Sequence, residues 1–286
     1  MQLGVIFPQL DIGPRVDEVR AYATAVERLG YRHISAYDHV LGADREAHEG
    51  FSGPYDITSR FQEPLVLFGY LAAVTSLELV TSVLILPQRQ TALVAKQAAQ
   101  VDLLSEGRFR LGVGVGWNAV EYEALGQDFA RRGAREEEQI ELLRRLWTEP
   151  SVTFDGRFDT VTGAGLAPLP LQRPIPIWLG GSSEPAYRRM GRSADGWFPQ
   201  VPPGDRLDDA LGIIAEAASA AGRDPSTIGM EGRVSWGRDG LGRVVDHADR
   251  WRAAGATHLS INTMGAGFTD LDDHLDALAQ VADALE

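Results

Sequence analysis

The chain has 286 residues, no cysteine, and a formal net charge of -13 from 27 basic and 40 acidic residues. This acidic balance would repel nucleic acid phosphates, and the lack of cysteine excludes disulfides, thiolate nucleophiles and thiolate metal sites. No apolar run reaches the roughly 18 residues of a membrane span, and the chain opens without a basic leader. We therefore expect a cytoplasmic protein that binds neither nucleic acid nor a membrane.

Two further chemistries lack the residues that they need. Lys96 is the only lysine, and it falls in an expected helix rather than at a strand end, so Schiff-base chemistry has one poorly placed candidate and a P-loop has none. The six histidines show neither H-x-H nor H-E-x-x-H spacing. We predict no metal site.

Apolar runs and amphipathic stretches alternate along the whole chain. Strands are predicted at residues 3–7, 32–37, 79–86, 109–115, 175–179, 196–199, 227–234 and 258–262. Helices are predicted at residues 16–29, 64–75, 91–104, 119–125, 134–147, 184–192, 206–221, 242–254 and 271–285. Unbroken alternation indicates a parallel sheet, and eight strand–helix units predict a closed (β/α)8 barrel.

Two segments interrupt this alternation of strands and helices. Residues 42–60 are rich in Gly, Asp and Pro and are too long for an ordinary loop after the second strand, which favours a lid or binding loop. Residues 119–174 follow the fourth strand and end in an irregular Gly/Pro-rich stretch at 151–174. Because the alternation then resumes at once, we expect insertions within one domain that spans residues 1–286.

The fourth predicted strand carries alternate glycines at Gly112, Gly114 and Gly116, followed by Trp117 and Asn118. Glycine has no side chain, so a planar ring could lie directly against the backbone here. A strand that merely lets a helix pack closely explains the pattern equally well. The spacing is not the G-x-G-x-x-G of a dinucleotide site.

The second strand ends in Asp38 and His39. Active sites of (β/α)8 barrels lie at the C-terminal ends of their strands, so this imidazole could exchange a proton or hydrogen-bond a ligand there. The alternative is a solvent-facing histidine beside a loop-pinning aspartate.

The fifth strand runs into Gly180, Gly181 and Ser182 at the start of a helix. Free N–H groups at a helix N-terminus favour an anion, and glycines permit its close approach, which makes a phosphate site plausible. An ordinary turn capped by serine fits the same residues.

Glycoside hydrolysis by two carboxylates is a competing chemistry for this fold. Glu231 lies in the seventh strand, but the fourth strand offers no acid at its end. Glu121, a turn further on, is a late and helical substitute.

These motifs together resemble the bacterial luciferase-like superfamily, and within it the branch that uses the deazaflavin coenzyme F420. The resemblance covers nearly the whole chain, and the joint occurrence of the segments in order makes it specific. The segments are Tyr37-Asp38-His39-Val40, Thr81-Ser82-Val83-Leu84, residues 104–118, Glu121-Tyr122, Leu125-Gly126, residues 176–181 and Ala194-Asp195-Gly196-Trp197.

The resemblance implies a TIM barrel of the luciferase-like type with insertions after strands two and four. It implies that His39 faces the coenzyme ring and substrate with Asp38 orienting it, that the Ser82–Val83 peptide bond is cis, and that the glycine turn holds a phosphate. The implied cofactor-binding residues are Ser82, Val83, Gly114, Gly116, Trp117, Asn118, Gly180, Gly181 and Ser182.

The function that follows is an F420-dependent oxidoreductase that moves a hydride between the coenzyme and a small organic substrate, in a homodimer. An FMN-dependent monooxygenase and a catalytically inactive flavin-binding protein are the alternatives. The sugar-phosphate dehydrogenases of this branch have a carboxylate where this chain has Trp117, and they use lysines. With aromatic residues at Phe51, Tyr55 and Phe61, we expect a flatter, more apolar substrate here.

Overall fold

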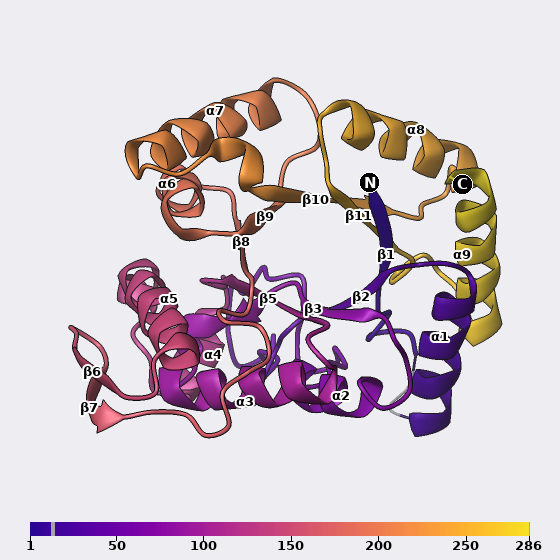
Figure 1. The fold of residues 1–286 in the computed structure, drawn as a ribbon. Helices are drawn as coiled ribbons and strands as arrows, with labels where there is room; N and C mark the ends of the chain where they lie inside the picture. The colour runs from indigo at the N-terminus through magenta and orange to yellow at the C-terminus, as the bar shows by residue number, and fades with distance from the viewer. Residues whose placement is uncertain (13–14, 286) are drawn as a thin grey trace.

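A closed parallel barrel with helices around its outside forms the body of the protein (Figure 1). The computed structural model describes residues 1–12 and 15–285. The barrel strands are β1 (Gln2–Ile6), β2 (His33–Ala36), β3 (Glu78–Thr81), β4 (Leu84–Ile85), β5 (Phe109–Gly114), β8 (Ile177–Gly181), β9 (Gly196–Pro199), β10 (Gly229–Ser235) and β11 (His258–Asn262). Both β3 and β4 pair with β5 and form one barrel strand, so the ring has eight. The predicted (β/α)8 barrel is confirmed.

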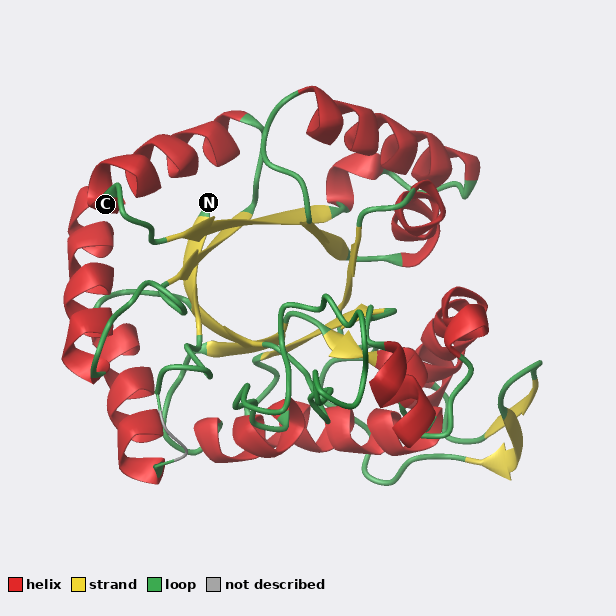
Figure 2. Cartoon of the chain, turned by 180° about the vertical axis from the view of Figure 1, so that it is seen from behind, coloured by secondary structure: helices red, strands yellow, loops and turns green. Residues whose placement is uncertain are grey.

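Helices cover the outer surface of the ring because their apolar faces pack on buried strand residues. They are α1 (Val16–Arg28), α2 (Pro64–Leu71), α3 (Thr91–Leu104), α6 (Glu184–Ser193), α7 (Asp205–Ala220), α8 (Gly240–Ala253) and α9 (Leu271–Leu285), with 3-10 turns η1 (Leu86–Gln88) and η3 (Pro225–Thr227). Seen from behind, loop segments lie across one side of the barrel opening (Figure 2). Among the described helices, none has the length and apolar character that crossing a bilayer requires.

The third barrel strand is broken, whereas one continuous strand over residues 79–86 was predicted. The Ser82–Val83 peptide bond between β3 and β4 is cis, as the resemblance implied. The carboxylate of Asp38 accepts a hydrogen bond from the Ile85 N–H at 2.9 Å, which holds the second half of the strand. The prediction was wrong on continuity because apolar periodicity does not register a break in the backbone.

The insertion after β5 is more ordered than predicted. It contains α4 (Ala119–Ala124), the 3-10 turn η2 (Phe129–Arg131) and α5 (Arg132–Thr148), and then an antiparallel pair, β6 (Val152–Asp155) and β7 (Thr160–Ala164). Figure 1 shows this hairpin outside the barrel, beyond α5. The expectation of an irregular segment at 151–174 was therefore wrong for its first half, where Phe154 pairs with Val161.

A charged network fills the barrel interior below the strand ends. Arg110 pairs with Glu231 at 2.7 Å and with Glu78 at 2.9 Å, and its guanidinium lies 4.1 Å from the centroid of the Trp178 ring. Glu231 also accepts from Ser260 at 2.6 Å. Burial alone would raise the pKa of Glu231, but nearby positive charge lowers it well below its ordinary value. The carboxylate is therefore held ionised inside the barrel.

His258 lies beside this network, and we expect it to make stability depend on pH. Its pKa is lowered to about 4, first by burial and then by the positive charge of Arg110. As the pH falls below about 6.5, His258 therefore becomes protonated in the unfolded chain while it stays neutral in the folded protein. This difference should lower the free energy of unfolding by about 1–2 kcal/mol between pH 7 and pH 5.

Urea unfolding at both pH values checks this. His258→Gln should lose less stability on acidification than the wild type does, while His48→Gln, in the long loop after β2, should behave as the wild type. Identical pH dependence in His258→Gln and the wild type would contradict the assignment.

Candidate active site

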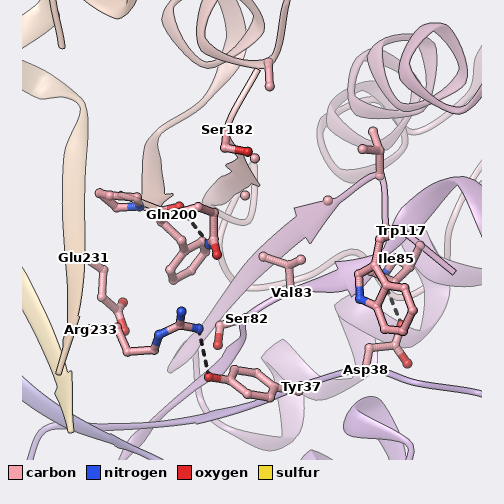
Figure 3. Close-up of a pocket in the computed structure, with 18 of the residues that line it drawn as sticks. Tyr37, Asp38, Ser82, Val83, Ile85, Trp117, Ser182, Gln200, Glu231 and Arg233 are labelled. Atoms are coloured by element: carbon pink, nitrogen blue, oxygen red, sulfur yellow. Dashed lines mark hydrogen bonds between the residues drawn. The ribbon is translucent and has the colours of Figure 1, made fainter. Parts of the chain in front are cut away.

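A cavity of about 460 Å³ opens at the C-terminal ends of the barrel strands (Figure 3). Segments far apart in the sequence meet there. The predicted residues that line it are Asp38, His39, Ser82, Val83, Gly114, Gly116, Trp117, Gly180, Gly181 and Ser182. Among the described residues, no group of three His, Asp or Glu side chains is arranged to hold a metal ion.

Asn118 is the predicted residue that the structure places elsewhere. Its side chain accepts a hydrogen bond from the Val120 N–H at 3.1 Å and caps α4, and its amide donates to the Leu41 carbonyl at 3.4 Å. It is buried and lines a smaller cavity of about 70 Å³ next to the main one. Its role in the structure is to fix the start of α4 against the loop after β2.

One wall of the cavity is glycine backbone covered by a single valine. A Cβ atom on Gly114 would lie 2.7 Å from a Val83 methyl group, and one on Gly180 would lie 3.0 Å from the other. Val83 therefore rests on both glycines and projects into the cavity (Figure 3). A Cβ atom on Gly112 would instead lie 1.8 Å from the Thr81 carbonyl oxygen, so that glycine serves strand packing. A ring on this wall would contact Val83 rather than bare backbone.

Gly114→Ala should displace this wall. The added methyl must push Val83 toward the cavity, and we expect roughly tenfold weaker coenzyme binding and a loss of about 1–3 kcal/mol of unfolding free energy. Fluorescence titration and urea unfolding measure the two effects. Gly69→Ala is the control, because Gly69 lies inside α2 with nothing near its Cβ position and should gain up to about 1 kcal/mol. Unchanged coenzyme binding in Gly114→Ala would argue against a ring on Val83.

Asp38 is a buried anchor rather than the partner of His39. One carboxylate oxygen accepts from Arg89 at 2.8 Å and the other from the Ile85 N–H. Burial raises the pKa of this carboxyl above its ordinary value, although Arg89 favours the charged form. Arg89 is also paired with Glu63 at 2.9 Å, at the start of α2. The expected orienting contact from Asp38 to His39 is not among the hydrogen bonds of the described residues.

The residue that orients His39 is Glu121. Its carboxylate lies 3.3 Å from the Nδ1 atom of His39 and accepts from the Val40 N–H at 2.8 Å. Burial would raise the pKa of Glu121, but these contacts, His39 first, lower it below its ordinary value. An ionised carboxylate at Nδ1 leaves Nε2 as the nitrogen that can face a ligand, and Nε2 has no hydrogen bond to the described residues.

Aromatic rings surround His39. The ring centroids of Phe61, Tyr55 and Trp117 lie 4.7, 5.0 and 5.5 Å from the centroid of the imidazole. Two of these rings come from the long segment after β2, and Arg45 ties that segment together through Asp56 at 2.6 Å. Trp117 remains 40% exposed at the rim. The imidazole therefore lies in an apolar surrounding that limits access of water.

The turn after β8 lines the cavity close to the start of α6. Gly181 has φ +150 and packs against Ala186, while Ser182 and Ser183 are exposed. Ser183 is the N-cap residue of α6 but makes no side-chain capping bond. The backbone N–H groups and the serine hydroxyls of this turn can therefore face an anion in the cavity.

Sequence reasoning missed several further residues of the cavity, among them two with long polar side chains. Arg233 and Gln200 line it from β10 and from the end of β9. Arg233 extends across the cavity and donates to the Tyr37 hydroxyl at 3.1 Å (Figure 3). The sequence did contain a signal for Arg233. It follows Glu231 by two residues, and the alternation of side chains along a strand places both on the inner face of the barrel.

The chain matches the family model described as luciferase-like monooxygenase over residues 2–271. It belongs to this family, whose members are oxidoreductases, and it is therefore an enzyme of that class.

Two relatives and one solved structure show the range of the family. The chain is 30% identical over 250 residues to an F420-dependent hydroxymycolic acid dehydrogenase of Mycobacterium tuberculosis, covering 85% of this chain and 65% of the relative. It is 32% identical over 187 residues to an FMNH(2)-dependent dimethylsulfone monooxygenase of Pseudomonas putida, covering 64% and 48%. An F420-dependent secondary alcohol dehydrogenase superimposes with a TM-score of 0.81 at 17% identity, covering 100% and 99%, which supports the fold.

Proposed function

We propose that the protein is an F420-dependent oxidoreductase that transfers a hydride between the deazaflavin coenzyme and a small organic substrate. The observation that carries the proposal is the His39–Glu121 pair, which faces the same cavity as the valine-covered glycine wall and the turn before α6. The match to an F420-dependent dehydrogenase over most of this chain supports it.

The cavity residues fit a flavin-like coenzyme. Gly114 and Gly180 keep the wall low enough for a flat ring to approach Val83, and a larger residue at either position would fill that space. Gly181 and Ser182 would hold the phosphate through backbone and hydroxyl donors at the α6 N-terminus. When bound, the coenzyme supplies the hydride chemistry.

The chain itself positions the substrate and moves a proton. Glu121 fixes the imidazole through Nδ1, so Nε2 of His39 can donate a proton to a substrate oxygen or accept one from it. Tyr55, Phe61 and Trp117 pack around this imidazole and reduce its contact with water. A flat, largely apolar substrate would suit these rings.

An FMN-dependent monooxygenase is the second candidate, favoured by the similarity to the dimethylsulfone monooxygenase. A deazaflavin has carbon where a flavin has N5 and is poor at forming the oxygen adduct that oxygenation requires, so the identity of the coenzyme separates the two reactions. A coenzyme-binding protein without catalysis is the third. A homodimer and a cytoplasmic location stay predictions from the sequence.

The experiment is a titration of the purified protein with F420 and, separately, with FMN, followed by quenching of ligand fluorescence. Tight binding of F420 and weak binding of FMN, together with F420-dependent turnover on a panel of alcohols, ketones and enones, is the expected result. The reverse preference would assign the protein to the flavin monooxygenases. Binding without turnover on any substrate would favour the inactive protein.

A further inference from the structure

A second cavity, of about 260 Å³, adjoins the main one and shares Pro199, Gln200 and Arg233 with it. Its lining contains no Asp or Glu from the described residues, although acidic residues outnumber basic ones by 40 to 27 in the chain. It is therefore a local concentration of positive charge in an acidic protein. The cationic and titratable residues that line it are Arg233, Arg243, His247 and Arg250.

Two of these guanidinium groups are hydrogen-bonded to uncharged oxygen atoms. Arg233 donates to the neutral hydroxyl of Tyr37, and Arg250 donates to the Pro203 carbonyl at 2.6 Å. Within residues 1–12 and 15–285, neither of them forms an ion pair with a carboxylate. Arg243 differs, because it pairs with Asp239 at 2.9 Å. Since each guanidinium has five N–H donors, Arg233 and Arg250 retain donors for a ligand.

Regular secondary structure holds these side chains in place. Arg243, His247 and Arg250 follow one another on α8 at spacings of four and three residues, so they share one face of the helix. Arg233 comes from β10, the strand directly before α8. The cationic wall is therefore built on rigid elements and needs no loop closure to form.

Arg233 also connects this cavity to the side of the main cavity where His39 lies. Its partner Tyr37 is two residues from His39, and the ring of Tyr55 contacts that imidazole. The turn at Gly181 and Ser182 is also a neighbour of this cavity, because Gly181 pairs with Pro199, which lines both cavities. An anion bound at Arg233, on β10, would therefore lie beside the Tyr37 hydroxyl, while the phosphate would be held by the backbone of the turn before α6.

We propose that Arg233 and Arg250, with His247 between them, form a carboxylate-binding subsite for the organic substrate. The inference rests on the proposed function and narrows it, since it makes the substrate an organic acid whose apolar part lies beside His39. Arginine suits this task because its planar donor pair matches the two oxygens of a carboxylate.

The test compares two probes that share a flat ring and differ in charge, fluorobenzoate and fluorobenzyl alcohol, by fluorine NMR titration. We expect the wild type to bind the carboxylate roughly tenfold more tightly than the alcohol. Arg233→Met and Arg250→Met should each lose most of this preference. Arg238→Met is the matched control, because Arg238 is exposed just after β10 and lines neither cavity, and it should keep the preference.

Equal affinity of the wild type for the two probes, or a preference that survives Arg233→Met and Arg250→Met in correctly folded protein, would overturn the proposal. F420 is itself a possible source of the bound carboxylate, because it carries glutamyl carboxylates and FMN does not. Titration of the same variants with F420 and with FMN tests this alternative. If Arg250→Met weakens F420 binding and leaves the probe preference intact, the subsite belongs to the coenzyme and the substrate assignment is wrong.

The two proposals can fail independently. A carboxylate preference that the arginine variants remove, in a protein that binds neither coenzyme, would support the subsite and defeat the proposed function. Coenzyme-dependent turnover without any preference for the carboxylate probe would do the opposite.

Discussion

Replacing His39 by asparagine is expected to lower turnover by about 10²- to 10⁴-fold while coenzyme affinity stays within a factor of about three. The amide nitrogen of asparagine can occupy the place of Nδ1 and keep the hydrogen bond to Glu121, which lies 3.3 Å away. What the variant loses is Nε2, the atom assigned to proton transfer. Steady-state kinetics with a substrate from the panel, and titration of the coenzyme, measure the two quantities separately.

Glu121→Gln is the companion variant. The amide keeps the shape of the carboxylate, but it is neutral and cannot accept from Val40 and Leu41 N–H groups and from His39 with the same strength. We expect a smaller loss of turnover together with a displaced pH profile, which is the mark of a positioning residue. Full turnover in His39→Asn would assign the proton step to another group, and a loss of coenzyme binding in the same variant would make His39 part of the ring site instead.

Removing the guanidinium of Arg110 should cost about 3–5 kcal/mol of unfolding free energy. Arg110→Met keeps most of the side-chain volume against Trp178 but leaves Glu231 charged in the barrel interior, where its remaining partners among the described residues are His33 and Ser260. The large expected loss is the cost of leaving the buried Glu231 carboxylate without Arg110, and it does not measure the net contribution of the Arg110–Glu231 pair to stability. Urea unfolding of the variant and the wild type measures this loss of unfolding free energy.

The control for this variant is Arg145→Met, which removes a half-exposed pair with Glu149 at the end of α5 and should cost no more than about 0.5 kcal/mol. The double variant Arg110→Met/Glu231→Gln should recover part of the loss, because it removes the unpaired charge as well. If Arg110→Met unfolds at the same urea concentration as Arg145→Met does, the network does not contribute to stability in the way its burial indicates.

The barrel could be predicted from the chain because its signal is repeated eight times. Alternation of strand and helix survives errors at any single element, such as the break between β3 and β4 or the hairpin formed by β6 and β7. Both errors are local, since hydrophobic periodicity reports which face of a strand is buried and not where its backbone changes course.

The site could be predicted only in part, for a related reason. His39 follows from the rule that barrel chemistry lies at the C-terminal face, whereas Val83 was implied only by the family resemblance. Glu121 does not follow from that rule, because it reaches His39 from a helix of the insertion, across 82 residues of sequence. The contact expected from Asp38 to His39 is missing among the described residues for the same reason, since the partner of Asp38, Arg89, also comes from another element. Adjacency in sequence was a poor guide to contact here.

The strand β10 carries two charged side chains that make different contacts. Glu231 belongs to the interior network with Arg110, while Arg233, one inward position nearer the mouth, borders both cavities. If Arg233 binds the substrate as proposed, substitutions there would change which small molecules the enzyme accepts without disturbing the charges of the interior network. A single-residue insertion in β10 before Glu231 would turn the side chains of both Glu231 and Arg233 from the inner to the outer face of the barrel. Diversification of this enzyme should thus proceed by substitution along β10, and insertions and deletions should be confined to the segments outside the ring.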